Sequence, residues 1–176
     1  MPGALFLEGQ NVNLRTIEEE DKEFLRDGVN NPKVGKKIGA EFKPLNLNQQ
    51  EEFFQNEIVS GDSIHLAISQ DQEIKGIISL IPRNDEVVKI GLWIEEESHG
   101  EGLGTEASEL MINYAFNQLN YHRILARALE PNKASNKLWQ KLGFTEEGTY
   151  REHVYRDGKH HDLKLYGLLK NEWESQ

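Results

Sequence analysis

The segment that decides the fold is Trp93-Ile-Glu-Glu-Glu-Ser-His-Gly-Glu-Gly-Leu-Gly-Thr-Glu-Ala-Ser-Glu-Leu-Met111. A mostly apolar run, Val87–Ile94, leads into it and is typical of a buried strand. Glycines follow at positions 100, 102 and 104, and apolar side chains then recur at helical spacing at Ala107, Leu110, Met111 and Tyr114. The pattern therefore predicts a strand, a glycine loop and a helix.

Such a loop has a structural and a functional interpretation. Glycine allows positive φ and a close approach of the backbone to a ligand, and the free N–H groups at a helix start attract anions. The loop is thus a candidate phosphate cradle, although a tight strand-to-helix turn would leave the same pattern. The P-loop motif is absent because no Lys follows Gly104. The dinucleotide fingerprint Gly-x-Gly-x-x-Gly requires a different spacing within a βαβ unit.

Composition limits the class of protein. The 176 residues predict one domain, 1–176, and no apolar run approaches the length of a membrane span or a signal peptide, so we expect a cytoplasmic protein with no membrane partner. The absence of cysteine excludes disulfides and a cysteine nucleophile. The formal net charge of −10 argues against nucleic-acid binding. It suits either a cationic substrate or solubility in a salty cytoplasm.

Periodicity and turn signals give the order of elements. Strands are predicted over residues 12–15, 64–69, 74–82, 87–94, 122–129, 145–155 and 161–169. Helices are predicted from a capping box at 16–19 to about 27, and over 48–60, 105–118 and 133–142. Asn132 is the expected N-cap of the last helix and Gly143 its C′ residue. Consecutive strands from 64 to 94 indicate an antiparallel meander within one α/β sandwich.

Three blocks in order resemble one family. The loop after Ile90-Gly-Leu-Trp-Ile94 resembles the coenzyme A loop of the GNAT N-acetyltransferases, and most of all the RimJ/RimL branch that acetylates ribosomal-protein N-termini. Asn132-Lys-Ala-Ser-Asn-Lys-Leu-Trp-Gln-Lys-Leu-Gly-Phe144 is similar to that branch's Asn-x-x-Ser segment. The third block is Glu147-Gly-Thr-Tyr-Arg151, then Asp157-Gly158, Asp162 and Tyr166.

The resemblance implies the GNAT fold, a mixed and mostly antiparallel splayed sheet flanked by helices, and acetyl-CoA as cosubstrate. It implies that the strand ending at Trp93 and Ile94 holds the pantetheine arm through its backbone, and that Asn132 also contacts this arm.

His99 stands where the family has Gln or Arg. Pyrophosphate would lie on the N–H groups of Gly100, Glu101, Gly102, Leu103, Gly104 and Thr105. Glutamates 95, 96, 97 and 101 flank the loop, and we expect them to weaken phosphate binding. Lysines 133, 137 and 141 lie on one helix face, and Lys137 is our candidate for a phosphate contact.

The resemblance also implies catalytic roles. Ser135 corresponds to a serine that protonates the leaving thiolate, and Trp139 occupies the position of a tyrosine that other GNAT enzymes use. Straightforward counting places Val154 at the branch's general-base position. We select Glu152, two residues earlier, because it would share a face with Val154 on a regular strand and His153 would point the other way. Without cysteine, the amine would attack directly in a ternary complex.

The acceptor remains open between a ribosomal-protein N-terminus, another peptide N-terminus and a polyamine-like small molecule. The resemblance places acceptor contacts in residues 34–44, where Lys36 and Lys37 follow Lys33. A homodimer is common in the branch. No metal is expected, since His160, His161 and Asp162 are adjacent on a strand and point alternately. We expect Glu106 and Glu109 to be solvated. A non-catalytic coenzyme A-binding or regulatory module, and a different nucleotide on the same loop, are the alternatives.

Overall fold

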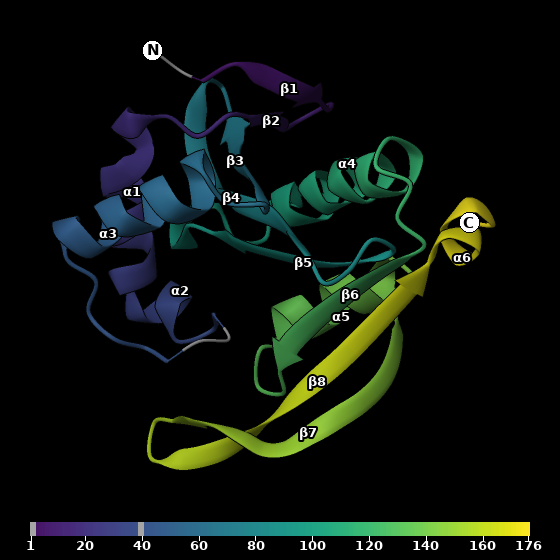
Figure 1. Cartoon of the computed structure of the whole chain (residues 1–176). Helices are drawn as coiled ribbons and strands as arrows, with labels where there is room; N and C mark the ends of the chain where they lie inside the picture. Colours follow the sequence, from purple (N-terminus) through teal and green to yellow (C-terminus); the bar gives the residue numbers. More distant parts are fainter. Residues whose placement is uncertain (1–2, 39–40) are drawn as a thin grey trace.

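The computed structural model describes residues 3–38 and 41–176, and these form a mixed α/β structure (Figure 1). Eight strands make one sheet in the order β1-β2-β3-β4-β5-β6-β8-β7. Every neighbouring pair is antiparallel except β5 and β6, which are parallel. The predicted fold class and the meander of β3, β4 and β5 are therefore confirmed.

Most observed helices and strands lie close to the ranges predicted from the sequence. The strands are β1 Leu5–Glu8, β2 Asn13–Arg15, β3 Ile64–Gln70, β4 Glu73–Pro82, β5 Val87–Ile94, β6 Arg123–Leu129, β7 Thr145–Arg156 and β8 Lys159–Leu169. The α-helices are α1 Lys22–Asn30, α2 Pro32–Gly35, α3 Leu47–Phe53, α4 Leu103–Asn117, α5 Lys133–Lys141 and α6 Lys170–Glu174. Short helical turns occupy Glu19–Asp21 (η1) and Glu96–Ser98 (η3), and a π-helical turn, Phe54–Val59 (η2), continues α3.

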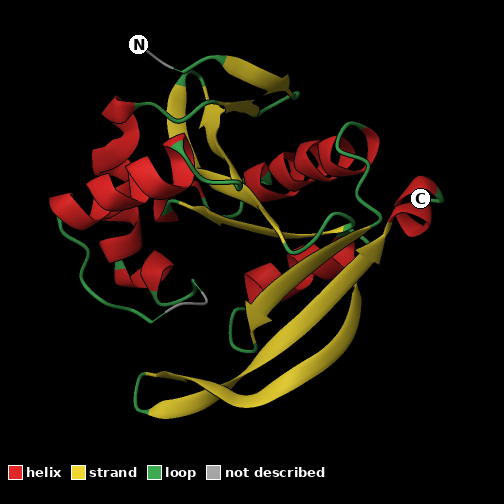
Figure 2. Cartoon of the chain, viewed as in Figure 1, coloured by secondary structure: helices red, strands yellow, loops and turns green. Residues whose placement is uncertain are grey.

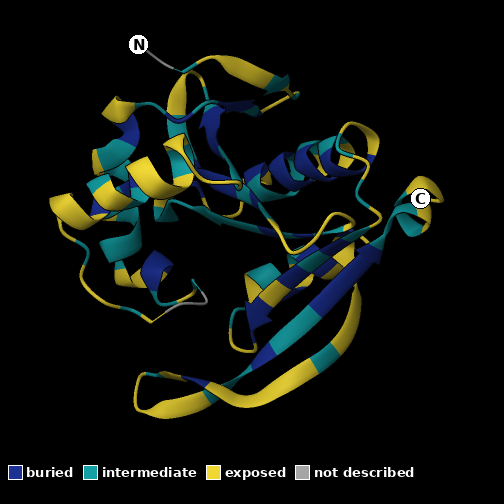
Figure 3. Ribbon diagram, viewed as in Figure 1, coloured by how far each residue is buried: buried dark blue, intermediate teal, exposed yellow. Residues whose placement is uncertain are grey.

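Helices cover both faces of the sheet (Figure 2). On one face the buried stripe of α4, together with Trp139 of α5, packs against β3 to β6 and builds the main core. The stripe is visible as the buried side of α4 in Figure 3. On the other face Leu25 of α1 and Phe54 pack on Ala67 and Ile77 in a smaller cluster. The periodic apolar positions read from the sequence therefore form these two clusters.

The sheet opens between its two parallel strands. β5 pairs with β6 only at Val87, Val88 and Lys89, whereas its pairing with β4 continues to Ile94. The N–H of Glu95 donates to the carbonyl of Lys75 at 2.8 Å, and this bond fixes the alternation of main-chain groups along β5. By that alternation Ile90, Leu92 and Ile94 turn their N–H and C=O groups away from β4, into the gap. The implied splay is therefore present.

Several boundaries differ from the prediction. The glycine-loop helix begins at Leu103 rather than 105, because Gly102 already serves as its N-cap. The capping box expected at 16–19 is wrong, because Thr16 Oγ1 accepts from the N–H of Ala4 and Asp21 accepts from the N–H of Glu18. The helix expected over 48–60 instead becomes π-helical from Phe54.

Two elements were not predicted, β1 and α6. Both are short, and β1 has mostly exposed side chains and pairs only with β2 at the edge of the sheet. Residues 39 and 40 of the acceptor loop expected over 34–44 lie outside the described residues, and part of that segment is the short helix α2.

Candidate functional site

The loop between β5 and α4 depends on its glycines for backbone conformation. Gly100 and Gly102 have φ of 86° and 83°, and a Cβ built on either would meet no heavy atom within 4 Å. Positive φ, and not crowding, therefore requires glycine at both positions. Gly104 differs, since its added Cβ would lie 3.3 Å from Leu92 Cδ1. Its missing side chain lets the start of α4 lie close against β5.

The loop presents free main-chain donors. Among the described residues, none accepts a hydrogen bond from the N–H groups of Gly100, Glu101, Gly102 or Leu103. Thr105 differs from the prediction, because its N–H donates to the carbonyl of Gly102 at 3.0 Å. The free donors therefore converge at the N-terminus of a 15-residue helix, where the helix dipole adds positive potential.

His99 connects this loop to the edge of the gap. Its Nε2 donates to the carbonyl oxygen of Ile94 at 2.9 Å. The imidazole thus closes over the last residue of β5 and keeps the loop next to the end of the gap. The structure therefore brings Ile94, His99 and Gly100 together.

The glutamates before the loop are partly neutralised. Glu95 lies 3.3 Å from Lys75 Nζ, and Glu96 pairs with Lys33 of α2. The Lys33 contact lowers the pKa of Glu96, so this carboxylate stays ionised and paired. Glu97 and Glu101 are exposed. The expected repulsion of phosphate is therefore confined mainly to these two.

Trp93 does not reach the gap. Its indole stacks on Phe24, with ring centroids 5.6 Å apart, and it fills the space that a side chain at Gly28 would need. By the alternation along β5 its main-chain groups face β4. Leu92, which the sequence did not single out, faces the gap together with Ile94.

The start of α5 lies after the end of β6, the strand on the other side of the gap. The side chain of Asn132 accepts from the N–H of Ser135 at 3.3 Å, which confirms its N-cap position. Within the described chain no group hydrogen-bonds Ser135 Oγ, so this hydroxyl is available to a ligand. Lys133 bonds Glu130 instead of standing free, and Lys137 is exposed.

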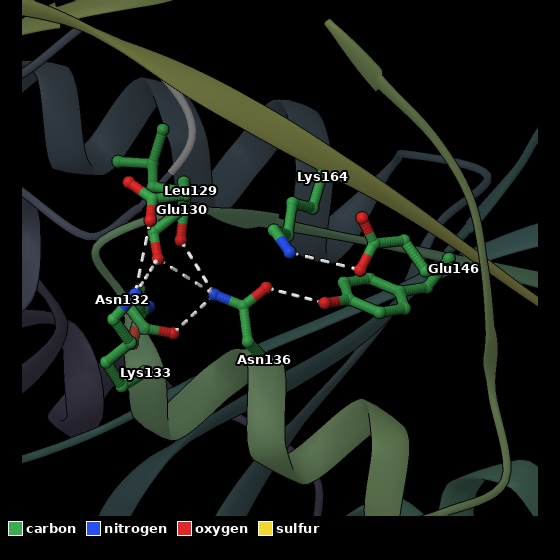
Figure 4. Close-up of polar contacts among 8 residues, drawn as sticks. Leu129, Glu130, Asn132, Lys133, Asn136, Glu146 and Lys164 are labelled. Carbon is green, nitrogen blue, oxygen red and sulfur yellow. Dashed lines mark hydrogen bonds and ion pairs between the residues drawn. The ribbon is translucent and has the colours of Figure 1, made fainter.

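A buried amide holds this helix start in place (Figure 4). Asn136 Nδ2 donates to the carbonyls of Leu129 at 2.9 Å and Asn132 at 2.8 Å, and its Oδ1 accepts from the Tyr166 hydroxyl at 2.6 Å. Sequence reasoning missed Asn136. The available signal was a polar residue three positions before Trp139, on the helix face that is buried.

Trp139 is a core residue. It is 1% exposed and packs against Phe144, with ring centroids 5.2 Å apart. An indole has only a weakly acidic N–H, so this position supplies no acid for the leaving group. The side chain instead anchors α5 on the sheet.

The second catalytic candidate lies on an irregular strand. The register of β7 against β8 shifts between Tyr150 and Val154, and Glu152 has φ of 49°. The assumption that Glu152 and Val154 share one face of a regular strand is therefore wrong. The N–H of Glu152 donates to Asp162 Oδ1 at 2.7 Å, and the Glu152 side chain is exposed. Both residues line a shallow hollow together with Tyr150, Arg151 and His153.

His65 and Ser79 form a polar pair on the sheet face that carries α1 and α3. His65 Nδ1 is 2.7 Å from Ser79 Oγ, and Ser79 pairs across the strands with Gly91 of β5. Burial lowers the pKa of His65, with Glu57 acting in the opposite direction, so the imidazole is neutral at neutral pH. A Cβ built on Gly91 would meet nothing within 4 Å. A neutral base and a hydroxyl thus lie beside open space on the face of β5 next to the gap.

Glu106 corrects an expectation. It is not simply solvated, because its carboxylate accepts from the N–H groups of Gln10, Asn11 and Val12 and from Asn11 Nδ2. Burial opposes ionisation, but these donors outweigh it and lower the pKa of Glu106. The carboxylate therefore ties the β1–β2 turn to the first turn of α4.

Across 3–38 and 41–176, no three His, Asp or Glu side chains form a group that could hold a metal ion. No helix in the same ranges is long and apolar enough to span a membrane.

A gap in the sheet lies beside a glycine loop with free amides, and free N–H groups at a helix start favour an anion. Comparison with known proteins assigns the class: the family described as "Acetyltransferase (GNAT) domain" matches residues 11–145. The chain therefore belongs to the GNAT acetyltransferase family. It is an N-acetyltransferase, which transfers an acetyl group to an amine.

Relatives support this assignment. The chain is 30% identical to the Bacillus subtilis (strain 168) protein named "Putative ribosomal N-acetyltransferase YdaF", over 95% of this chain and 96% of that one. The spermidine N-acetyltransferase of Vibrio cholerae, solved in complex with CoA and spermine, has the same fold with a TM-score of 0.87 at 22% identity, covering 94% and 99% of the two chains. RimL, a ribosomal L7/L12 alpha-N-protein acetyltransferase solved with coenzyme A, aligns with a TM-score of 0.83 at 20% identity, over 94% and 98%.

Proposed function

We propose that acetyl-CoA is the donor and that it lies in the gap between β5 and β6. The free N–H groups of residues 100–103 support a pyrophosphate position at the start of α4. The unpaired main-chain groups of Leu92 and the N–H of Ile94 offer hydrogen bonds to the amides of the pantetheine arm. This unpaired strand edge is the observation that carries the proposal, because buried backbone groups without partners require a ligand or water.

The acceptor that we propose is the α-amine of a peptide, of a ribosomal protein or another protein. The support is the 30% identity, over nearly the whole chain, with a relative whose name gives a ribosomal substrate. A polyamine is the second candidate, favoured by the net charge of −10, which attracts cations. We further propose that the enzyme acts in the cytoplasm and that the chain forms one domain. A homodimer remains part of the proposal, testable by sedimentation.

The reaction needs a donor and an acceptor of protons. In the proposed mechanism the neutral amine attacks the thioester carbonyl directly, since the chain has no cysteine to carry the acetyl group. The hydroxyl of Ser135 protonates the departing thiolate, and this role is supported because none of the described residues hydrogen-bonds the hydroxyl. Asn132 holds the segment that presents Ser135.

Two groups are candidates to accept the amine proton. Glu152 is exposed and would act through water. The alternative is His65, which would receive the proton through the hydroxyl of Ser79. Ser79 of this pair is the cross-strand neighbour of Gly91, and the imidazole is already neutral.

A substrate panel tests the function. Purified protein with acetyl-CoA would be offered N-terminal peptides and spermidine, and free thiol would be measured. Ser135→Ala should lower kcat by about 10²-fold or more, the usual range for a lost proton donor, with KM for acetyl-CoA little changed. Unchanged kcat in this variant would refute the role of Ser135. Tight acetyl-CoA binding with no turnover on any amine would instead favour the non-catalytic module.

A further inference from the structure

The face of the sheet around Gly91 carries positive charge that the strongly acidic chain leaves unpaired. Lys89 lies two residues before Gly91 on β5 and therefore shares its face. Lys89 pairs in register with Leu125 of β6, and Arg127 follows two residues later on that same face. Arg83 enters from the turn before β5, where its N–H donates to the carbonyl of Val87.

Among the described residues, no carboxylate forms an ion pair with Lys89, Arg127 or Arg83, although most other ion pairs of the chain use its abundant glutamates. Lys89 is partly buried, and burial together with the charges of Arg83 and Arg127 lowers its pKa. Like charges gathered at a partly buried site repel each other, so an anion bound among them would be stabilised.

The basic cluster of Lys89, Arg83 and Arg127 has open space for a ligand beside it, and side chains near it are held in fixed positions. Open space lies over Gly91, between Lys89 and Trp93, and Trp93 is held by its stack on Phe24. On the far side the guanidinium of Arg127 lies 6.0 Å from the centre of the Tyr150 ring, which holds it on this face. The ion pair of Lys36 with Asp157 links the end of α2 to the tip of the β7–β8 hairpin (Figure 1).

We propose that the open space over Gly91 binds a carboxylate of the acceptor, with Lys89 as its principal partner and Arg127 as the second charge. The inference rests on the proposed function, because it takes the open face beside the gap as the acceptor's side. It specifies the substrate class as an amine that carries a carboxylate nearby. The carboxylate can be an acidic side chain next to a peptide's N-terminus or the α-carboxylate of a free amino acid. A polyamine, which has only positive charge, is disfavoured at this position by the same cations.

The test measures kcat/KM on matched acceptors. One arm compares C-terminally amidated peptides that begin Ser-Glu and Ser-Gln, and a second arm compares serine with serinamide. We expect the acceptor with the carboxylate to be preferred by about tenfold or more in at least one arm, the usual size of a charged hydrogen bond. The arm that shows the preference identifies the source of the carboxylate.

Variants connect the preference to these residues. Lys89→Met and, separately, Arg127→Gln should lower the preference toward one while acetyl-CoA binding is retained. Arg127 is exposed, so its variant also serves if Lys89→Met does not fold. Lys170→Gln is the matched control: it removes the same charge at the start of α6, away from the open space over Gly91, and should keep the preference.

Three results would overturn the inference. Equal kcat/KM in both arms, or a preference for spermidine over every acidic acceptor, would refute the carboxylate site and leave acetyl transfer standing. A preference that survives in both Lys89→Met and Arg127→Gln would place the site elsewhere. If the wild-type protein binds acetyl-CoA but acetylates none of these amines, the proposed function fails and this inference fails with it.

Discussion

The Tyr166→Phe substitution isolates the contact that fixes the start of α5. It removes only the hydroxyl that donates to Asn136 Oδ1 at 2.6 Å, and both side chains are buried, at 1% and 8% exposure. The ring remains, so no cavity of note forms. Asn136 Oδ1 is then left in the interior without a donor (Figure 4).

The expected loss follows from this geometry. A buried acceptor that loses its donor costs about 1–3 kcal/mol of unfolding free energy. For a chain of this length that corresponds to a fall in Tm of about 2–4 °C per kcal/mol. Burial raises the pKa of Tyr166, with Glu146 adding to the effect and Lys164 opposing it, so the hydroxyl stays protonated at neutral pH. The loss should therefore be the same at pH 6 and pH 8.

The contact also positions the site. Asn136 holds the carbonyls of Leu129 and Asn132, so a looser Asn136 should loosen the segment that presents Ser135. We expect a higher KM for acetyl-CoA and a lower kcat in Tyr166→Phe, with the chemistry otherwise intact. Asn136→Leu should be more destabilising, since it removes the side-chain donor to the carbonyls of Leu129 and Asn132 and leaves the Tyr166 hydroxyl unpaired.

Urea unfolding followed by tryptophan fluorescence measures the first effect, and steady-state kinetics measures the second. Tyr155→Phe is the matched control, because Tyr155 is 59% exposed and should change stability by less than about 0.5 kcal/mol. Equal midpoints for Tyr166→Phe and Tyr155→Phe would refute the reasoning. A loss of stability in Tyr166→Phe with unchanged kinetics would refute the positioning role.

Three further predictions concern the loop, the turn and the proton acceptor. Gly102→Ala should destabilise the fold by about 1–2 kcal/mol, because alanine is strained at the positive φ of this residue. It should also weaken acetyl-CoA binding. Thermal unfolding measures the first effect and calorimetry the second, and tighter binding would contradict the prediction. Glu106→Gln should lose about 2 kcal/mol at pH 7 in urea unfolding. Because the folded pKa of Glu106 lies below its ordinary value of 4.5, the deficit should persist above that pH and shrink as the pH falls through the folded pKa. If His65 accepts the amine proton, Ser79→Ala should lower kcat/KM by at least about 10²-fold. Because the pKa of His65 lies below its ordinary value of 6.5, the wild-type rate should then fall only below that pH. Full activity in Ser79→Ala would leave the role to Glu152.

Local signals predicted much of the fold. The bounds of β5 were predicted from its apolar run, and Asn132 and Gly143 marked the ends of α5, since caps and turns depend on neighbours a few residues away. The glycine loop was likewise recognisable, because positive φ limits the choice of residue.

Contacts distant in sequence could not be predicted in this way. Glu106 meets Gln10 from 96 residues away, and Asn136 meets Tyr166 from 30 residues away. The irregularity of β7 depends on how its register meets β8, so the face of Glu152 was misjudged. The row of His65, Ser79 and Gly91 appears only once three strands are paired.

The central claim is that the gap between β5 and β6, together with the loop at Gly100–Leu103, binds acetyl-CoA. Isothermal titration of the purified protein with acetyl-CoA tests it most directly, at low and high salt and with ATP and NAD as controls. Saturable binding of one acetyl-CoA per chain, tighter than either control, is the predicted result. Stronger binding at high salt would show that Glu97 and Glu101 repel the phosphates. No binding at either salt would contradict the account of the site.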